Sequence, residues 1–182
     1  MKTETTKIKD LLIIHPTIFE DERGYFFEAY NQAKFNKEEI KYQFIQDNQS
    51  FSKRGVIRGL HLQINPFAQA KLVRVLEGEI LDVAVDLRKK SPTYGQHVSV
   101  LLSAENKKQL MIPHGFAHGF SVLSETASVM YKVDQLYDKN SERGIHFDDP
   151  TLNIDWQLEA NEIIISEKDL ILPHFKDIDW EF

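Results

Sequence analysis

Apolar and polar residues alternate in short runs over most of the chain, and from Val56 onward turn residues separate these runs. In the clearest run, 81–87, every second residue is apolar, namely Leu81, Val83, Val85 and Leu87. A period of two with one wholly apolar face is the pattern of a β-strand. The same reasoning predicts strands over 72–76, 98–102, 110–112, 116–123 and 127–133.

Gly, Pro and charged residues lie between these predicted strands, as at 77–78, 91–95 and 104–108. Many short strands separated by turn residues, with almost no helical period, are typical of an all-β sandwich or barrel. Alternating strands and helices would instead leave longer segments with a helical period. The pattern therefore predicts an all-β fold.

The two ends of the chain are less regular than this central region. Before it, we expect an extended segment over 11–19, a polar turn at 21–24, a short helix within 31–40 and a strand over 42–48. After it comes a charged loop at 138–144, then a tail over 153–182 with both tryptophans and a short helix beginning near Ser166. No repeat or low-complexity tract divides the chain, so we expect one domain over 1–182 with peripheral arms.

Composition narrows the classes of function. The chain has 182 residues, of which 42% are hydrophobic, enough for one ordinary core. It has no cysteine, which excludes disulfides and thiolate metal sites. Its net charge is -6 and it has no extended basic run, so we expect no nucleic-acid partner. A small anionic ligand needs only a few local cations and stays possible.

The only early apolar run is 11–14, too short for the core of a signal peptide, and no stretch approaches a membrane span. We therefore expect a cytoplasmic protein with no membrane partner. The sequence also lacks the Gly-rich phosphate loops of dinucleotide-binding and P-loop proteins.

Candidate chemistry gathers in the segment 55–71, which contains Arg58, His61 and Lys71. A lone histidine in a strand is more often a hydrogen-bonded core residue than a catalyst. Here, however, two cations accompany an imidazole that titrates near neutral pH, a combination suited to an anionic substrate and a proton transfer. His61 is then a candidate general base, and Lys71 or His118 a candidate for stabilising an enolate.

Two spaced motifs resemble those of the cupin double-stranded β-helix. Gly55 precedes His61 by six residues, and 113–118 reads Pro-x-Gly-x-x-His. Metal-binding cupins continue the first motif as His-x-His, whereas this chain has Gln63 in the second position, and an amide is a poor transition-metal ligand. We therefore expect a cupin jelly roll without a metal. In a regular strand Arg58 and His61 would face opposite ways, so one shared pocket requires a bulge, which we place at Gly59.

Seven motifs together resemble the dTDP-4-dehydrorhamnose 3,5-epimerase family. They are RGLHLQ at 58–63, AQAKLVR at 68–74, DVAVDLR at 82–88, SPTYG at 91–95, PHGFAHGF at 113–120, DERGYF at 21–26 and FIQDN at 44–48. The resemblance extends from about Leu11 to Asp169 in matching order. It implies a homodimeric, cofactor-independent cupin that inverts C3 and C5 of dTDP-4-dehydro-6-deoxy-D-glucose to give dTDP-4-dehydro-L-rhamnose.

The resemblance also implies catalytic roles. His61 would be the base, Tyr131 the acid on the other face of the sugar, and Lys71 the group near the C4 oxygen. Asp169 would be the carboxylate partner of the base, although Ser166 and Asp169 also fit a capping box for the last helix. Without the resemblance, Tyr131 could equally be a wall residue that alternates with its apolar neighbours.

Substrate contacts are carried over in the same way. The resemblance assigns contacts with the phosphates or the sugar to Arg23, Arg58 and Lys168. It assigns contacts with the nucleoside to Glu28, Gln46 and Asn48, and stacking on the thymine ring to Tyr137. His118 and Glu142 complete the substrate-binding set. For Arg23 with Glu28, or Glu142 with Arg143, the alternative is an exposed ion pair of little consequence.

Other functions remain open at this point. A 3-epimerase or a ketoisomerase could use the same base with a different acid. A metal cupin could use His61, His118 and a further carboxylate. A non-catalytic cupin could simply bind a nucleotide sugar.

Overall fold

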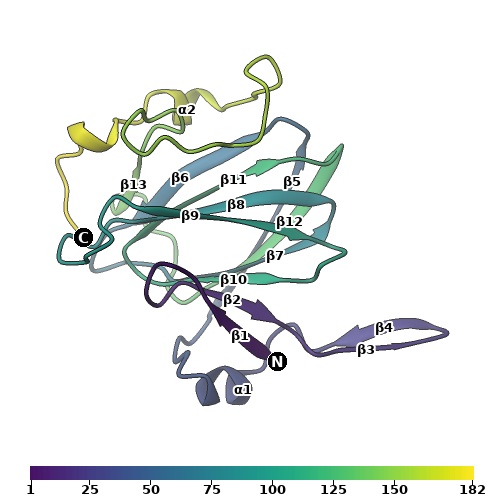
Figure 1. Cartoon of the computed structure of the whole chain (residues 1–182). Coiled ribbons are helices and arrows are strands. Elements are labelled where there is room, and N and C mark those ends of the chain that lie inside the picture. Colours follow the sequence, from purple (N-terminus) through teal and green to yellow (C-terminus); the bar gives the residue numbers. More distant parts are fainter.

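The structure is a computed structural model that describes residues 1–182. Strands dominate it, and the helices are short (Figure 1). The strands are β1 (Lys2–Thr5), β2 (Leu12–His15), β3 (Ile18–Asp21), β4 (Gly24–Phe27), β5 (Gln46–Lys53), β6 (Ile57–Gln63), β7 (Lys71–Glu77), β8 (Glu79–Asp86), β9 (His97–Ser103), β10 (Gln109–Ile112), β11 (Phe116–Val122), β12 (Thr126–Val133) and β13 (Glu142–Gly144). The helices are α1 (Gln32–Lys37), α2 (Glu167–Leu170) and the 3-10 turn η1 (Phe175–Asp177).

Two antiparallel sheets face each other and form the body of the molecule. One has six strands in the order β1-β2-β10-β7-β12-β5, and the other has five in the order β13-β6-β11-β8-β9. Neighbouring strands in space are often distant in sequence, as in a jelly roll. The predicted all-β, cupin-type fold is thus confirmed.

The main core lies between the two sheets. It includes Val73 and Val129 from the six-stranded sheet and Ile80, Ala84 and Phe120 from the five-stranded sheet, all of them buried. These residues alternate with outward-facing neighbours along their strands, which is the period that the sequence shows.

A second core covers the outer face of the five-stranded sheet. Leu81, Val83 and Val85 of β8 pack there against Trp156 and Leu152 of the C-terminal segment. In Figure 1 this segment, coloured yellow-green to yellow, lies across that sheet. Asp82 and Asp86 alternate with these outward-facing apolar residues, so they face the interior between the two sheets, where they are fully buried.

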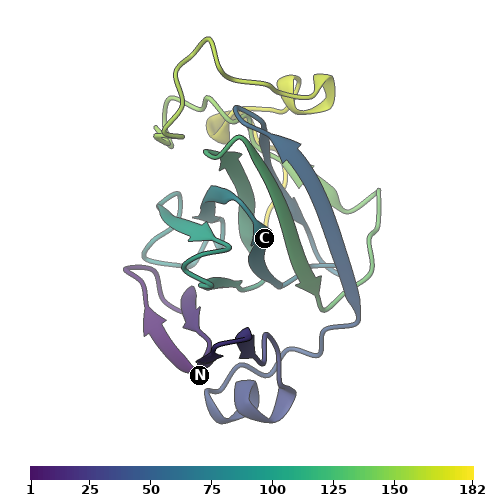
Figure 2. The same ribbon diagram turned by 90° about the vertical axis from the view of Figure 1, so that its right-hand side faces the viewer.

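The N-terminal part forms the opposite side of the molecule. Phe35 of α1 packs with Ile14, Leu72 and Met111 in a third buried cluster on the outer face of the six-stranded sheet. The hairpin of β3 and β4 projects from the body, as both views show (Figures 1 and 2). Its Phe19 and Phe26 are exposed.

The peripheral elements differ in detail from the prediction. The strand expected at 42–48 begins only at Gln46, because Tyr42 and Phe44 instead pack beside the third cluster. Part of the expected charged loop at 138–144 is strand β13, which pairs with β6, and β1 was not predicted. The short helix near Ser166 is present as α2. No helix is both long and apolar enough to reach across a bilayer.

Candidate active site

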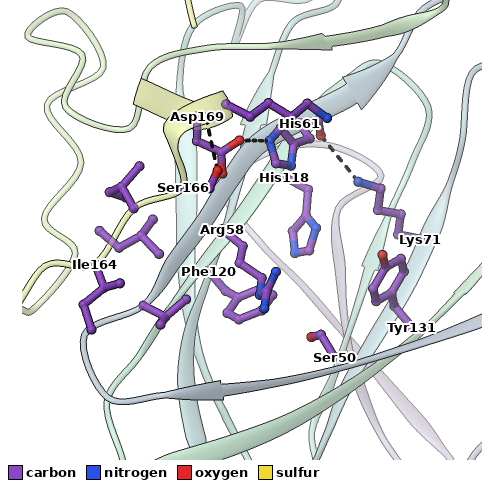
Figure 3. A pocket seen from close by; sticks show the side chains of 14 residues that line it. Ser50, Arg58, His61, Lys71, His118, Phe120, Tyr131, Ile164, Ser166 and Asp169 are labelled. Atoms are coloured by element: carbon purple, nitrogen blue, oxygen red, sulfur yellow. Dashed lines mark hydrogen bonds and ion pairs between the residues drawn. The ribbon is translucent and has the colours of Figure 1, made fainter. Parts of the chain in front are cut away.

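A cavity of about 530 Å³ is lined by inward-facing residues of both sheets. His61 and Arg58 of β6 and His118 of β11 line it from the five-stranded sheet. Lys71 of β7 and Tyr131 of β12 line it from the six-stranded sheet. The C-terminal segment closes one side with Asp169 and its neighbours (Figure 3). Strands far apart in the chain thus supply one site.

A bulge in β6 turns Arg58 and His61 toward the same cavity. His61 lies opposite His118 and Arg58 opposite Phe120, so three steps along β6 match two steps along β11. Gly59 occupies the extra position with a φ of 117°, a value that favours glycine. A Cβ there would lie 2.6 Å from the carbonyl oxygen of His118. The predicted bulge at Gly59 is confirmed.

His61 and Asp169 form the pair expected of an oriented base. Nε2 of His61 lies 2.7 Å from Oδ1 of Asp169, although the residues are 108 positions apart in the chain. The carboxylate is 6% exposed and the imidazole 29% exposed, so the pair is shielded on the carboxylate side and open on the ring side. Nδ1 of His61 is then the nitrogen left for the substrate.

Asp169 also serves the helix that carries it, so both interpretations of 166–169 hold. Its backbone N–H donates to Oγ of Ser166, the N-cap of α2, at 3.2 Å. Burial is the largest single effect and raises the pKa of Asp169, but the hydrogen bond and charge of His61, together with the hydrogen bonds from Gly59 and Ser166, keep the pKa below its ordinary value. The carboxylate is therefore ionised at neutral pH and can balance a charge on the ring.

Lys71 is a buried ammonium with few partners. Its Nζ donates one long hydrogen bond, 3.4 Å, to the backbone oxygen of His61. Burial lowers the pKa of Lys71 to about 8, while the charges of Asp82 and Glu142 oppose the fall. At neutral pH most of the population stays protonated, with donor capacity free for a ligand.

Tyr131 faces His61 from the opposite sheet (Figure 3). It lies opposite Val73 on β7, and Lys71 lies opposite Val133, so Tyr131 and Lys71 are diagonal neighbours on one face of the sheet. Burial raises the pKa of the Tyr131 phenol, which keeps its proton at neutral pH. The hydroxyl can therefore donate a proton from the side opposite His61.

His118 forms a second pair with a carboxylate. Its Nε2 lies 2.7 Å from Oδ1 of Asp82, and these side chains are 7% and 0% exposed. Burial lowers the pKa of His118, against the influence of Asp82, so the ring is neutral at pH 7. Both histidines thus bond a carboxylate through Nε2.

The residues expected to contact the phosphates, the sugar and the nucleoside lie in different parts of the structure. Arg58 and Lys168 line the cavity. Lys168 bonds Glu142 at 2.6 Å, and Tyr137 donates to Glu142 at 2.9 Å, so these three form a cluster at the rim.

Gln46 and Asn48 share the inward face of β5 with Ser50, and Asn48 lies opposite Tyr131. Arg23 and Glu28 lie away from the cavity of their own chain. Arg23, 85% exposed on the projecting hairpin, pairs with Asp21, and Glu28 pairs with Lys34.

The donor set of the metal-cupin alternative is not gathered. No group of three or more His, Asp or Glu side chains lies close enough together to hold a metal ion. The two cavity histidines instead bond separate carboxylates.

Sequence reasoning missed several cavity residues. Ser50 and Ile164 line the cavity, and Asp82 supports it from behind. The first two carry no distinguishing pattern. Asp82 did carry one signal, since an aspartate in a central strand of a compact core is unusual.

Comparisons with known proteins show what the whole chain is similar to. The sequence profile described as dTDP-4-dehydrorhamnose 3,5-epimerase matches residues 5–177. A dTDP-4-dehydrorhamnose 3,5-epimerase of Shigella flexneri is 50% identical over 182 residues and 99% of both chains. The crystal structure of dTDP-4-dehydrorhamnose 3,5-epimerase from Elizabethkingia anophelis superposes with a TM-score of 0.94, 54% identity and 99% coverage of each chain.

A structure with a bound sugar nucleotide is also similar. It is the dTDP-6-deoxy-D-glucose-3,5-epimerase of Legionella pneumophila in complex with dTDP-4-keto-L-rhamnose. The TM-score is 0.94 and the identity 47%, over 98% of this chain and 94% of that one.

Proposed function

The chain belongs to the dTDP-4-dehydrorhamnose 3,5-epimerase family, and from this premise we propose how its cavity performs the reaction. It is an isomerase that inverts C3 and C5 of dTDP-4-dehydro-6-deoxy-D-glucose and forms dTDP-4-dehydro-L-rhamnose. One observation carries the mechanism: an oriented imidazole faces a phenol across the cavity, with an ammonium beside the phenol. Inversion needs a base and an acid on opposite faces of the sugar, and the two sheets supply one each.

His61 removes the proton in the first step. C3 and C5 both lie next to the C4 ketone, so loss of either proton gives an enolate. Nδ1 of His61 takes the proton, because Nε2 is held by Asp169. The imidazolium that forms lies against an ionised, buried carboxylate, which offsets its charge and keeps the ring oriented.

Lys71 stabilises the enolate. Its ammonium lies in the cavity wall with one weak bond to the protein, so the developing oxyanion at C4 gains a donor that is already in place. A preorganised donor of this kind lowers the activation free energy by about 3 to 4 kcal/mol.

Tyr131 returns a proton on the other face. Its hydroxyl stands on β12, across the cavity from His61 on β6. Delivery from that side inverts the carbon instead of restoring it. The first inversion leaves His61 protonated and Tyr131 without its proton. Exchange with solvent returns both groups to their starting states, and a shift of the sugar ring then lets the same pair act on the other carbon.

The rim residues bind the nucleotide. Arg58 and Lys168 offer positive charge for the diphosphate, and Tyr137 and Glu142 lie beside Lys168, where a thymine ring can stack on the exposed phenol ring. Gln46 and Asn48 extend the same inward face of β5 toward the nucleoside.

Arg23 and Glu28 reach a substrate only from a second copy of the chain. The hairpin of β3 and β4 carries Arg23, ends just before Glu28 and projects from the body (Figure 2). It exposes Phe19, Tyr25 and Phe26, an apolar surface suited to burial in a partner. We therefore propose a homodimer in which each hairpin completes the partner's site. Analytical ultracentrifugation of wild type and Phe26→Asp would test this: a stable dimer in both variants contradicts the hairpin's role.

Location in the cytoplasm stays a prediction, which cell fractionation would test.

The reaction itself is tested by proton NMR in heavy water. Chelator-treated protein is mixed with dTDP-4-dehydro-6-deoxy-D-glucose, and deuterium is followed at C3 and C5. We expect label at both carbons, without added metal or cofactor. Label at C3 alone would identify a 3-epimerase, and movement of the carbonyl a ketoisomerase. Binding without any exchange, even with metal restored, would identify a binding module.

A further inference from the structure

Asp82 is a fully buried carboxylate that the mechanism above does not use. It lies on β8 and faces the interior between the sheets, next to the cavity but without lining it. One of its oxygens bonds His118, and the other, Oδ2, is enclosed and has no hydrogen-bond partner. Burying a carboxylate in this way is costly, so its retention at this position calls for a function.

The bond between Asp82 and His118 fixes where the imidazole carries its proton. An ionised carboxylate only accepts hydrogen bonds, so Nε2 of His118 must be the protonated nitrogen. A neutral imidazole has one protonated nitrogen, and Nδ1 is then a bare acceptor. The carboxylate thereby selects one of the two tautomers.

Nδ1 of His118 opens onto the cavity. Ser50 Oγ and Asp82 Oδ2 are the two enclosed side-chain atoms that lack a partner. Nδ1 bonds no protein group and is not one of these enclosed atoms, so it must reach the space that His118 lines. The second imidazole therefore presents an acceptor to whatever fills the cavity.

We propose that Asp82 is a positioning residue that makes His118 a hydrogen-bond acceptor for a hydroxyl of the sugar ring. His118 then holds the sugar by accepting a proton donor and does not donate to the enolate. This replaces one alternative raised from the sequence, in which His118 stabilises the enolate charge; that role falls to Lys71 alone. The inference rests on the proposed function for the identity of the sugar.

The charges around Asp82 agree with this assignment. Lys71 is the cation of the cavity wall whose pKa the Asp82 charge raises, against the larger opposing effect of burial. Burial also lowers the pKa of His118. The charge of Lys71 acts in the same direction on the pKa of His118, because a charged imidazole there would add a second buried positive charge.

The tautomer can be read directly, without turnover. Nitrogen-15 NMR of histidine-labelled wild-type protein at pH 7 separates a protonated ring nitrogen from a bare one, and the His118→Gln spectrum identifies the His118 signals. We expect Nε2 protonated and Nδ1 bare. A protonated Nδ1 would overturn the proposal. Deuterium exchange into substrate tests the proposed function separately, so either can fail alone.

The hydroxyl contact is tested with dTDP-D-glucose, which has ring hydroxyls but no ketone, and with dTDP as the control. We expect the Nδ1 resonance to move when dTDP-D-glucose is added and to stay in place with dTDP. Phosphorus NMR confirms that each ligand is bound. An unchanged Nδ1 signal with bound dTDP-D-glucose, or an equal shift with dTDP, would contradict the contact.

Asp82→Asn tests the positioning, because an amide can also donate and so permits the other tautomer. We expect kcat/KM to fall by about tenfold at most, the loss expected when the His118 acceptor is removed, and we expect a mixture of His118 tautomers. Asp86→Asn is the matched control. Asp86 is equally buried on the same face of β8, but it bonds Arg88, Ser91 and Thr93. The Asp86→Asn protein should give the same His118 signals as the wild type. An Asp82→Asn protein with a wild-type tautomer and wild-type kcat/KM would refute the role.

Discussion

Two histidine–carboxylate pairs stand in one cavity and differ in where their carboxylates come from. His61 bonds Asp169 of the C-terminal segment, and His118 bonds Asp82 of the adjacent strand β8. Both contacts measure 2.7 Å and both use Nε2, so each ring offers Nδ1 to the substrate. The first ring is 29% exposed and the second 7%.

This difference in surroundings separates a base from an acceptor. The more exposed His61 can take a proton, because solvent and Asp169 together stabilise the imidazolium. His118 lies deeper, and burial lowers its pKa, so it accepts a hydrogen bond without taking the proton. Similar contact geometry therefore gives different chemistry when the desolvation differs.

Two matched variants, His61→Gln and His118→Gln, give the clearest test of this difference between a base and a hydrogen-bond acceptor. A glutamine amide can keep the bond that Nε2 makes to the carboxylate, but it has no counterpart of Nδ1. Loss of the base should lower kcat by up to about 10⁴-fold, whereas loss of one acceptor should lower kcat/KM by about tenfold. Steady-state kinetics gives kcat and kcat/KM for both variants, once each is shown to be folded and to bind dTDP. Equal losses would mean that the two rings share one role.

Lys71→Met removes the ammonium group from the cavity wall. We expect kcat to fall by about 10²- to 10³-fold, as for other single oxyanion donors. Deuterium exchange at C3 should fall in parallel, because the enolate itself is destabilised. Unchanged exchange with slow product formation would place Lys71 in a later step.

Tyr131→Phe sharpens the comparison by removing the acid and leaving both histidine pairs intact. Product formation should fall by about 10²-fold. Deuterium exchange at C3 should persist longer than turnover, since His61 can still remove and return a proton on its own face. If exchange and turnover fell equally, Tyr131 would not be the acid.

The pH dependence gives the smallest effect. Lys71 donates only while protonated, and its pKa is about 8. As pH rises through that value the ammonium is lost, so kcat should fall on the alkaline side, by about tenfold for each further pH unit. Stopped assays between neutral and alkaline pH, with a return to pH 7 as the reversibility control, measure this limb. A flat profile across the region would remove Lys71 from the rate-limiting step.

Local patterns in the sequence predicted much of the body of the fold. Alternation at 81–87 and in the neighbouring runs predicted the central strands β7 to β12, and Ser166 marked the start of α2. The pairing of His61 with Asp169 also matches the prediction, although it came through family resemblance and not from spacing. The bulge at Gly59 followed from a steric argument that two side chains must share one face.

Long-range packing decided the remaining features. Nothing local shows that the C-terminal segment covers the outer face of β8, or that the six-stranded sheet covers the inner face, where Asp82 and Asp86 lie buried. Pairing of Glu142–Gly144 with β6 likewise depends on tertiary contact. Arg23 illustrates a further limit, since the hairpin that carries it projects from the body and leaves its side chain exposed, away from the cavity that the sequence resemblance assigned it to.

The origin of Asp169 has a consequence for biosynthesis. A ribosome makes His61 and every strand of both sheets before it makes the segment that carries Asp169. During that interval the apolar face of Leu81, Val83 and Val85 has no cover, because its partners Leu152 and Trp156 come late in the chain. A nascent chain thus offers this face to chaperones and proteases until the segment docks. When the segment docks, it covers this apolar face and also brings Asp169 to His61, so the chain gains its protection and its catalytic pair in one step.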